Sequence, residues 1–270
     1  MQIPIVACVL LYANLALGAP GTLMRRQRAA ERLAERKLSR SSNILQPAEN
    51  EVAVASTGND TAHPEYSSNW AGAVLIGSGY KTVTGSIVVP TPKTPSGGSS
   101  SQQYSASGWV GIDGDTCATA ILQTGIDFTV RGSSVSYDAW YEWYPDYAYD
   151  FSGITIKAGD TITMTVTASS KSAGTAVIEN ETTGQRVSHS FSGETDALCE
   201  TNAEWIVEDF SSGGSLVNFA DFGTVQFTGA SVNGGTGVSG ATIIDIQQNG
   251  KVLTDCSTSG SSTVVCEYTG

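Results

Sequence analysis

The chain has 270 residues and is acidic, with 26 Asp and Glu residues against 14 Lys and Arg residues and a formal net charge of −12 at pH 7. A surface of this sign repels nucleic acid, so nucleic-acid binding is excluded as a main function. Hydrophobic residues make up 40% of the sequence, enough to bury a core in one large domain or two small ones.

The N-terminal residues have the pattern of an export signal. Residues 1–18 are apolar and end in Ala16-Leu17-Gly18, a small-x-small cleavage pattern. We therefore predict a signal peptide over residues 1–18 and a secreted, extracellular protein. No later segment is long and apolar enough to span a bilayer, so no membrane partner is expected.

The next part of the chain differs sharply in charge from the rest. Residues 19–40 hold seven basic and two acidic residues, a net charge of +5, whereas the chain from Tyr66 onward has seven basic and twenty acidic residues, a net charge of −13. The run RAAERLAERKL favours a helix. We interpret residues 19–65 as a propeptide and polar linker that complements the acidic domain and serves as its inhibitor or chaperone. A solvated basic tail is the plainer alternative.

From Tyr66 to Gly270 the sequence predicts strands. Twelve short runs rich in Val, Ile, Thr, Tyr and Trp alternate with clusters of Gly, Ser, Asn and Asp. This pattern predicts one all-β domain over residues 66–270, an antiparallel sandwich or barrel. Asn249-Gly250 predicts a type I′ hairpin turn. Residues 91–103, rich in Pro, Gly and Ser, are predicted to form a mobile loop. Asn180 begins a sequon at a turn and is therefore an exposed candidate for glycosylation.

Four cysteines remain once the signal peptide is removed: Cys117, Cys199, Cys256 and Cys266. In an oxidising compartment an even number predicts two disulfides, for which three pairings are possible. Cys256 and Cys266 flank a turn between two strand-like runs, so we favour a local bridge there and Cys117–Cys199 as the second. No Cys-x-x-Cys spacing occurs, and neither a metal nor a cofactor is expected.

Several catalytic chemistries lack their residues. His189 is the single histidine beyond Tyr66 and has no nucleophile motif beside it, which disfavours Ser-His and Cys-His hydrolases. No Asp-Thr-Gly or Asp-Ser-Gly occurs, so a pepsin-type site is not expected and insensitivity to pepstatin is predicted.

Carboxylates recur at alternate positions in two strand-like segments, residues 137–144 and 203–210. Because side chains alternate between the faces of a strand, each segment presents its carboxylates on one face. These face-sharing residues are Asp138, Trp140, Glu142 and Tyr144 in the first segment, and Glu204, Ile206 and Glu208 in the second. Half-buried carboxylates need partners, so such a face indicates a cleft for acid chemistry.

A carboxylate suits acidic surroundings as a general base, since Glu titrates near 4.3 whereas histidine is already protonated there. An uncharged amide is a suitable partner, because its NH₂ group can stabilise an oxyanion at any pH. Gln123 fits this role, on the same strand face as Ile121 and Asp127.

The residues around these positions resemble the signature blocks of the glutamic peptidases, or eqolisins. The blocks are NWAGAVL, WVGIDGDTC, AILQTG, YDAWYEWYP and NAEWIVEDF, in the order of that family, and the resemblance runs from about Ser67 to the C-terminus. It implies a concanavalin-like, jelly-roll β-sandwich of two antiparallel sheets and an acid endopeptidase that acts on polypeptides. Its catalytic dyad falls on Gln123 and Glu208, the amide stabilising the oxyanion and the carboxylate activating water.

The resemblance also implies a set of residues that line the cleft, gives Glu204 no catalytic role, and agrees with the favoured disulfide pairing. The implied cleft residues are Trp109, Asp113, Asp127, Asp138, Trp140, Glu142 and Tyr144. Two alternatives remain: a jelly-roll glycoside hydrolase that uses Glu142 and Glu208, and a secreted lectin-like module. A monomer is the expected state.

Overall fold

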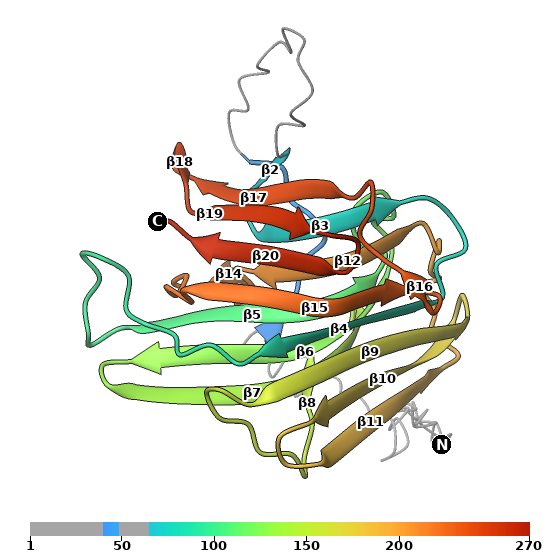
Figure 1. Cartoon of the computed structure of the whole chain (residues 1–270), viewed down its shortest axis with the longest axis horizontal. Coiled ribbons are helices and arrows are strands. Elements are labelled where there is room, and N and C mark those ends of the chain that lie inside the picture. The colour runs from blue at the N-terminus through green and yellow to red at the C-terminus, as the bar shows by residue number, and fades with distance from the viewer. Residues whose placement is uncertain (1–39, 49–64) are drawn as a thin grey trace, which may run out of the picture. The chain divides into compact units, whose positions relative to one another are not determined.

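The structure is a computed structural model that describes residues 40–48 and 65–270. The predicted signal peptide, the expected helical run and the remainder of the propeptide lie outside the described residues. The described part consists mainly of two large β-sheets packed face to face (Figure 1). Within these ranges, no helix is long and apolar enough to cross a membrane.

The first large sheet has nine strands in the order β18-β17-β3-β12-β5-β6-β7-β8, with β2 beside β17. All of its pairings are antiparallel except that of β2, which runs parallel to β17. Its strands are β2 (Glu65–Ser67), β3 (Trp70–Ile76), β5 (Gln103–Ile112), β6 (Ile121–Arg131), β7 (Ser134–Tyr144), β8 (Tyr149–Asp150), β12 (Asn202–Glu208), β17 (Thr242–Gln248) and β18 (Lys251–Val252).

The second large sheet has eight strands in the order β11-β10-β9-β4-β15-β20-β19, with β16 beside β15. Its strands are β4 (Thr82–Val88), β9 (Thr161–Ser170), β10 (Ala173–Asn180), β11 (Gln185–Ser192), β15 (Thr224–Val232), β16 (Gly235–Thr236), β19 (Thr254–Ser259) and β20 (Thr263–Tyr268). A small third sheet joins β1 (Arg40–Ser41), β13 (Ser211–Ser212) and β14 (Ser215–Leu216).

Strand alternation divides the nine-stranded sheet into two chemically different faces. On β12, Ala203, Trp205 and Val207 belong to the main core between the two sheets, where the Trp205 indole nitrogen donates to the carbonyl of Thr84 at 2.8 Å. Ile206, between them, belongs to a second apolar cluster on the other face. We call that face, which is turned away from the eight-stranded sheet, the outer face.

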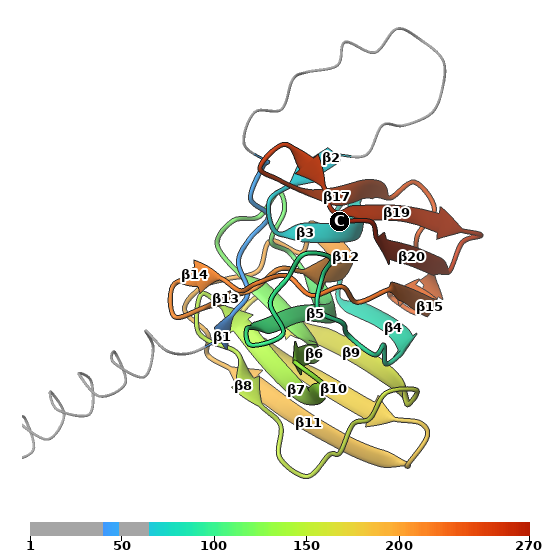
Figure 2. The ribbon, with the colours of Figure 1, turned by 90° about the vertical axis from the view of Figure 1, so that its left-hand side faces the viewer.

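The outer face is covered by residues 40–48, which we call the cleft segment. Figure 2 shows it in blue along the side of the nine-stranded sheet opposite to the second sheet. It runs alongside β2, where the Ala48 amide donates to the Tyr66 carbonyl at 3.1 Å. Ile44 and Leu45 pack against the outer apolar cluster. A part of the chain that the sequence assigned to a linker therefore lies on the domain itself.

The sandwich, the disulfides and the hairpin confirm their predictions. Cys117 is bonded to Cys199 and Cys256 to Cys266, and the second bridge links β19 to β20. Asn249 and Gly250, between β17 and β18, have φ values of 51° and 75°, the left-handed pair that a type I′ turn requires.

The expectation that Asn180 is exposed is wrong. Its side chain is fully buried at the end of β10, and its amide nitrogen donates to the Thr155 carbonyl and to the Asp160 carboxylate, each at 2.9 Å. The side-chain oxygen accepts from the amides of Thr182 and Thr183. The sequon asparagine thus organises its own turn, and in the folded domain it is inaccessible as a glycosylation site.

This turn gives a stability prediction. Asn180→Ala should lower the free energy of unfolding by about 2–3 kcal/mol, because it removes the hydrogen bonds of a buried side chain to the Asp160 carboxylate, the Thr155 carbonyl and two backbone amides. Denaturant unfolding measures the change, and Glu181→Gln, at the exposed next position, is the matched control. Equal stability of Asn180→Ala and wild type would contradict the structural role.

Candidate active site

The candidate site is assembled by neighbouring strands of the outer face. The register places Glu208 of β12 opposite Ser107 of β5, and Ser107 opposite Asp127 of β6. Further along the same strands, Gln123 of β6 lies opposite Glu142 of β7. Because alternate residues of antiparallel neighbours share a face, all of these side chains belong to the outer face.

Tryptophans fill the space between the polar positions. Trp109 of β5 packs edge-on against Trp70 of β3, with ring centroids 5.0 Å apart. Gly125 makes room for the rings, since a Cβ atom there would lie 2.5 Å from the Cβ of Trp109 and 2.8 Å from the ring of Trp140. A larger residue at this position would push the indoles out of place.

Glu208 is held by one indole and one peptide group. Its Oε2 accepts from the Trp109 indole nitrogen at 3.0 Å, and its Oε1 accepts from the backbone amide of Asn43 at 2.9 Å. The side chain is fully buried beneath the cleft segment, and burial raises its pKa to about 7, whereas Arg40 and the hydrogen bonds act to lower it. Both oxygens of this carboxyl are therefore occupied.

Glu142 binds the same segment one residue earlier. Its Oε2 accepts from the Ser42 amide at 3.2 Å and from Nη1 of Arg40 at 3.2 Å. Burial raises the pKa of Glu142 to about 8, Arg40 opposes this change, and Glu208 adds to it. Two consecutive backbone amides of the cleft segment thus donate to Glu142 and to Glu208, respectively.

Gln123 is also fully buried, but neither its amide nitrogen nor its oxygen has a hydrogen-bond partner among the described residues. The sheet register alone does not place it beside Glu208, since the two residues lie two strands apart and are offset along them, with Trp109 between. Any group that contacts both must occupy the space over the outer face.

Arg40 occupies an acidic and aromatic recess of the outer face. Its Nε lies 2.8 Å from Oδ2 of Asp127, and its Nη2 donates to the Ser107 hydroxyl at 3.1 Å. The guanidinium carbon lies 3.7 Å from the ring centroid of Trp140 and 4.7 Å from that of Phe210. This combination of ion pairs and cation–π contacts is how a partly desolvated arginine is stabilised.

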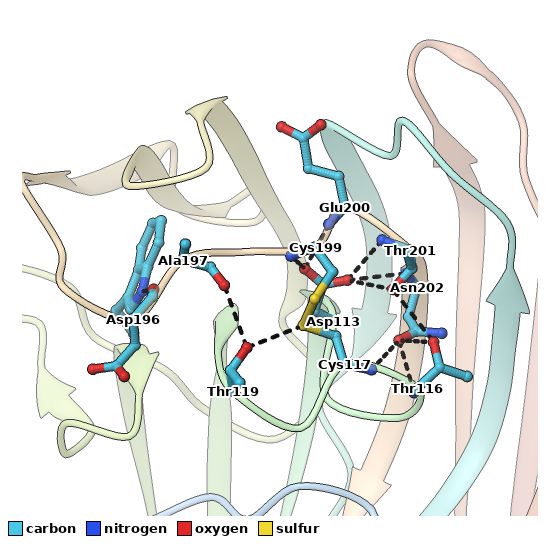
Figure 3. Close-up of a disulfide and its surroundings, with 11 residues drawn as sticks. Asp113, Thr116, Cys117, Thr119, Asp196, Ala197, Cys199, Glu200, Thr201 and Asn202 are labelled. Carbon is cyan, nitrogen blue, oxygen red and sulfur yellow. Dashed lines mark hydrogen bonds between the residues drawn. A yellow bond between two sulfur atoms is a disulfide. The ribbon is translucent and has the colours of Figure 1, made fainter.

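Asp113 does not contribute a side chain to this cluster, which corrects the expectation that it lines the cleft. Figure 3 shows it at the Cys117–Cys199 disulfide. Its carboxylate accepts from the backbone amides of residues 199–202, at 2.7–3.1 Å. The Asp113 carboxylate lies close to the sulfur atoms of Cys117 and Cys199. Because the two sulfur atoms form a disulfide, these three residues have a structural role and do not make a metal site.

The two remaining cleft candidates lie at the margins. Asp138 is exposed as a whole residue and lies opposite Asp127. Neighbouring atoms still desolvate part of its carboxyl, and this effect, followed by the charge of Asp150, raises its pKa. Tyr144, opposite Ile121, packs against the outer apolar cluster at the other end of β7. Of the predicted cleft residues, the structure therefore joins Trp109, Asp127, Trp140 and Glu142 most closely to Glu208.

Sequence reasoning missed the cleft segment and its contacts. Arg40 was grouped with the other basic residues, and Ser107 and Phe210 were not singled out, although all three meet in one recess. The available signal is the apolar pair Ile44-Leu45, which stands three polar residues after the end of the basic run.

Glu204 is a further carboxyl of this face. It is fully buried, and neither of its oxygens has a hydrogen-bond partner in the part of the chain that the structure describes. Burial raises its pKa well above the ordinary value, and the charges of Asp113 and Asp115 add to the effect. Such an environment favours the neutral acid.

Comparisons with known proteins agree with the fold. The family model described as Peptidase A4 family matches residues 68–268. Aspergillopepsin-2 of Aspergillus niger is 55% identical over 94% of this chain and 95% of its own length, and scytalidopepsin B of Scytalidium lignicola is 46% identical over 97% of each.

A solved structure of scytalido-glutamic peptidase with a transition state analog inhibitor matches with a TM-score of 0.67 and 48% identity, covering 74% of this chain and 98% of that one. The all-β sandwich with a carboxyl-rich outer face is thus of the glutamic peptidase class. The chain belongs to the peptidase A4 family.

The buried carboxyls predict how stability depends on pH. Burial raises the pKa to about 6 for Asp245, about 7 for Glu208 and about 8 for Glu142 and Asp209, above the values near 4 of an unfolded chain. Between these limits the folded state binds more protons than the unfolded state, so stability is fully present below about pH 4 and falls as pH rises towards 8.

Glu204→Gln tests this prediction, because glutamine is neutral at every pH. The variant should be more stable than wild type at pH 7.5, by on the order of 2 kcal/mol, and nearly equal to it at pH 4. Thermal unfolding across this range, with the exposed Glu181→Gln as control, measures the difference. A wild-type melting temperature that rises from pH 4 to pH 8 would contradict the assignment.

Proposed function

We propose that the chain is a secreted acid endopeptidase whose processed form begins near Tyr66, acts as a monomer and cleaves polypeptides with Glu208 and Gln123. Glu208 as carboxylate deprotonates a water molecule that attacks the scissile carbonyl carbon. The amide NH₂ of Gln123 stabilises the resulting oxyanion. The proton taken up by Glu208 then passes to the nitrogen of the leaving amine as the C–N bond breaks.

The observation that carries this proposal is the peptide backbone already bound over Glu208. Consecutive amides of Ser42 and Asn43 donate to Glu142 and Glu208, and the Asn43 carbonyl accepts from the Trp70 indole nitrogen at 2.9 Å. An outer face with these donors and acceptors binds an extended polypeptide through its main chain. The amide of Asn43 is the kind of group to which a general acid must give a proton.

Gln123 supports the oxyanion role through its unsatisfied amide. A buried amide without protein partners is costly, so a native site retains it where water or a bound group satisfies it. A substrate carbonyl over the outer face can do so, and the amide can donate to it at any pH.

Two observations disfavour the glycoside hydrolase alternative with Glu142 and Glu208. The relatives of the chain are peptidases by name and family, and the outer face binds peptide amides with these same two carboxyls. Insensitivity to pepstatin remains part of the proposal.

Two substitutions test the dyad. Glu208→Gln should abolish peptide hydrolysis and leave the melting temperature at acid pH unchanged or higher, because it removes the base and keeps the shape. Gln123→Ala should lower kcat by about 10²-fold or more, the scale of one oxyanion donor. Hydrolysis of a denatured protein at pH 3 is the assay, a soluble polysaccharide is the control substrate, and near-normal activity of Glu208→Gln would overturn the assignment.

We further propose that the cleft segment keeps the enzyme latent before processing. It covers the outer face, and the Asn43 amide occupies the carboxyl oxygen of Glu208 that a water molecule would need. Because burial is the largest cause of the raised pKa of Glu208, removal of the segment also restores a carboxyl that ionises in acid. The segment thus blocks both the binding of substrate and the formation of the base.

The ion pairs of Arg40 make the binding of the cleft segment partly electrostatic. It lowers the pKa of Asp127, Glu142 and Glu208, whereas burial raises all three. Coupling is reciprocal, so protonation of these carboxyls weakens their attraction for Arg40. Acid therefore loosens the ion-pair part of the contact and favours removal of the propeptide by the enzyme itself.

Arg40→Gln in the full-length proenzyme should allow processing at higher pH and a faster onset of activity, because it removes both ion pairs and the cation–π contacts. Arg40→Lys keeps the charge and should fall between the variant and wild type. The loss of the propeptide is followed by mass spectrometry after shifts from pH 9 to a series of lower pH values, with Lys157→Gln as a control at an exposed site. An unchanged pH threshold in Arg40→Gln would exclude the latch.

A further inference from the structure

The cleft segment continues past the proposed dyad and is bound there through its main chain. The Asn43 carbonyl accepts from the Trp70 indole nitrogen at 2.9 Å, and the Leu45 amide donates to the Gly114 carbonyl at 3.0 Å. Neither contact involves a side chain of the segment, so another polypeptide in the same position can make both. The groups that bind the segment belong to the β-sandwich domain and remain when the segment is removed.

Asn69 is the central group of this binding surface. Its side-chain nitrogen donates to the Ile44 carbonyl at 3.2 Å, and its side-chain oxygen accepts from the Gln46 amide at 2.9 Å. A carbonyl and the amide two residues later are the two groups that one residue of a neighbouring parallel strand binds, so the Asn69 side chain takes the place of a strand residue. The amide of Ser68 also donates to the Gln46 carbonyl, at 2.8 Å.

The domain itself holds Asn69 in position. Asn69 directly precedes β3 and is buried. Its backbone carbonyl accepts from the Asp209 amide at 2.9 Å, which connects it to the residue after Glu208. Its side-chain oxygen lies 2.9 Å from the Ser67 hydroxyl. These contacts fix the Asn69 amide relative to the proposed catalytic base.

The position of Asn43 gives the register of this surface relative to the reaction. Its amide donates to Glu208, the group that gives its proton to the leaving amine in the proposed mechanism. Asn43 therefore stands where the first residue of the leaving product would stand, and residues 44–46 take the second to fourth positions. Leu45, in the third position, packs against the outer apolar cluster.

We propose that Ser68, Asn69 and Gly114 bind the leaving part of a polypeptide substrate through its main chain, over four residues after the scissile bond. This inference rests on the proposed function, because the register depends on Glu208. The favoured substrate is an unfolded polypeptide with at least four residues beyond the cleaved bond. Because Asn69 contacts main-chain groups, it selects for length and an extended conformation rather than for particular side chains.

Two synthetic substrates with the same scissile bond test the length requirement. One has a single residue after that bond, the other has four, and both end in an amide. At pH 3 the longer substrate should have a kcat/KM about tenfold higher or more, because it gains several hydrogen bonds. Mass spectrometry of the products verifies that both are cleaved at the same bond. Equal kcat/KM values would overturn the proposal.

A backbone ester in a longer substrate locates the effect at Asn69. An ester in place of the amide between the third and fourth residues removes the hydrogen that the Asn69 oxygen accepts, and should lower kcat/KM about fivefold in wild type. In Asn69→Leu the ester should have little effect, because its acceptor is already absent. Proline in the fifth position is the control and should cause no loss, since Pro47 fills this position in the cleft segment.

The outcomes are distinct from those that test the dyad. If Glu208→Gln remains active, the dyad is wrong for substrates of any length. If the dyad holds but the ester causes no loss in wild type, the fourth residue is not bound and the proposal is wrong. A purely structural role of Asn69 would lower the rates of amide and ester substrates alike in Asn69→Leu and leave their ratio as in wild type, which would also overturn the proposal.

Discussion

The burial of several carboxyl groups on one sheet face is the constraint on which the rest of this structure depends. Burial raises the pKa of Asp127, Glu142 and Glu208, and the described ion pairs to this face all come from Arg40. A buried carboxylate is tolerated only with a cation, with hydrogen bonds or as the neutral acid. At high pH the cleft segment supplies the cation and the hydrogen bonds. In acid, protonation converts these groups to the neutral acid.

This constraint connects stability with activity. The inner face of the nine-stranded sheet is apolar and packs against the second sheet, so it holds the strands in register regardless of pH. The outer face can then carry groups that do not favour folding. Glu204 shows the cost most clearly, because it is fully buried without a partner among the described residues. A protein with such a face is more stable in acid, because its buried carboxyl groups are then neutral.

The two faces of β7 differ in chemistry. Trp140 and Glu142 lie on the outer face and meet Arg40, whereas Tyr141 and Trp143 lie on the other side and pack against Phe191. β7 is joined to β8 near the edge of its sheet, where the Ala148 amide donates to the Arg40 carbonyl. The ion pair that joins the cleft segment to this strand therefore belongs to its outer face.

The sequence by itself determined the all-β class, the carboxyl-bearing strand faces, the hairpin turn and the disulfides. Each depends on local periodicity, on the left-handed preference of Asn-Gly or on cysteine arithmetic, which a single chain displays directly. Tertiary structure alone decided which residues meet across strands. It turned Asp113 towards the amides of residues 199–202, buried Asn180 at its own turn, and placed Arg40 between Asp127 and Glu142. These contacts join residues 20–102 positions apart, and no local pattern specifies such pairings.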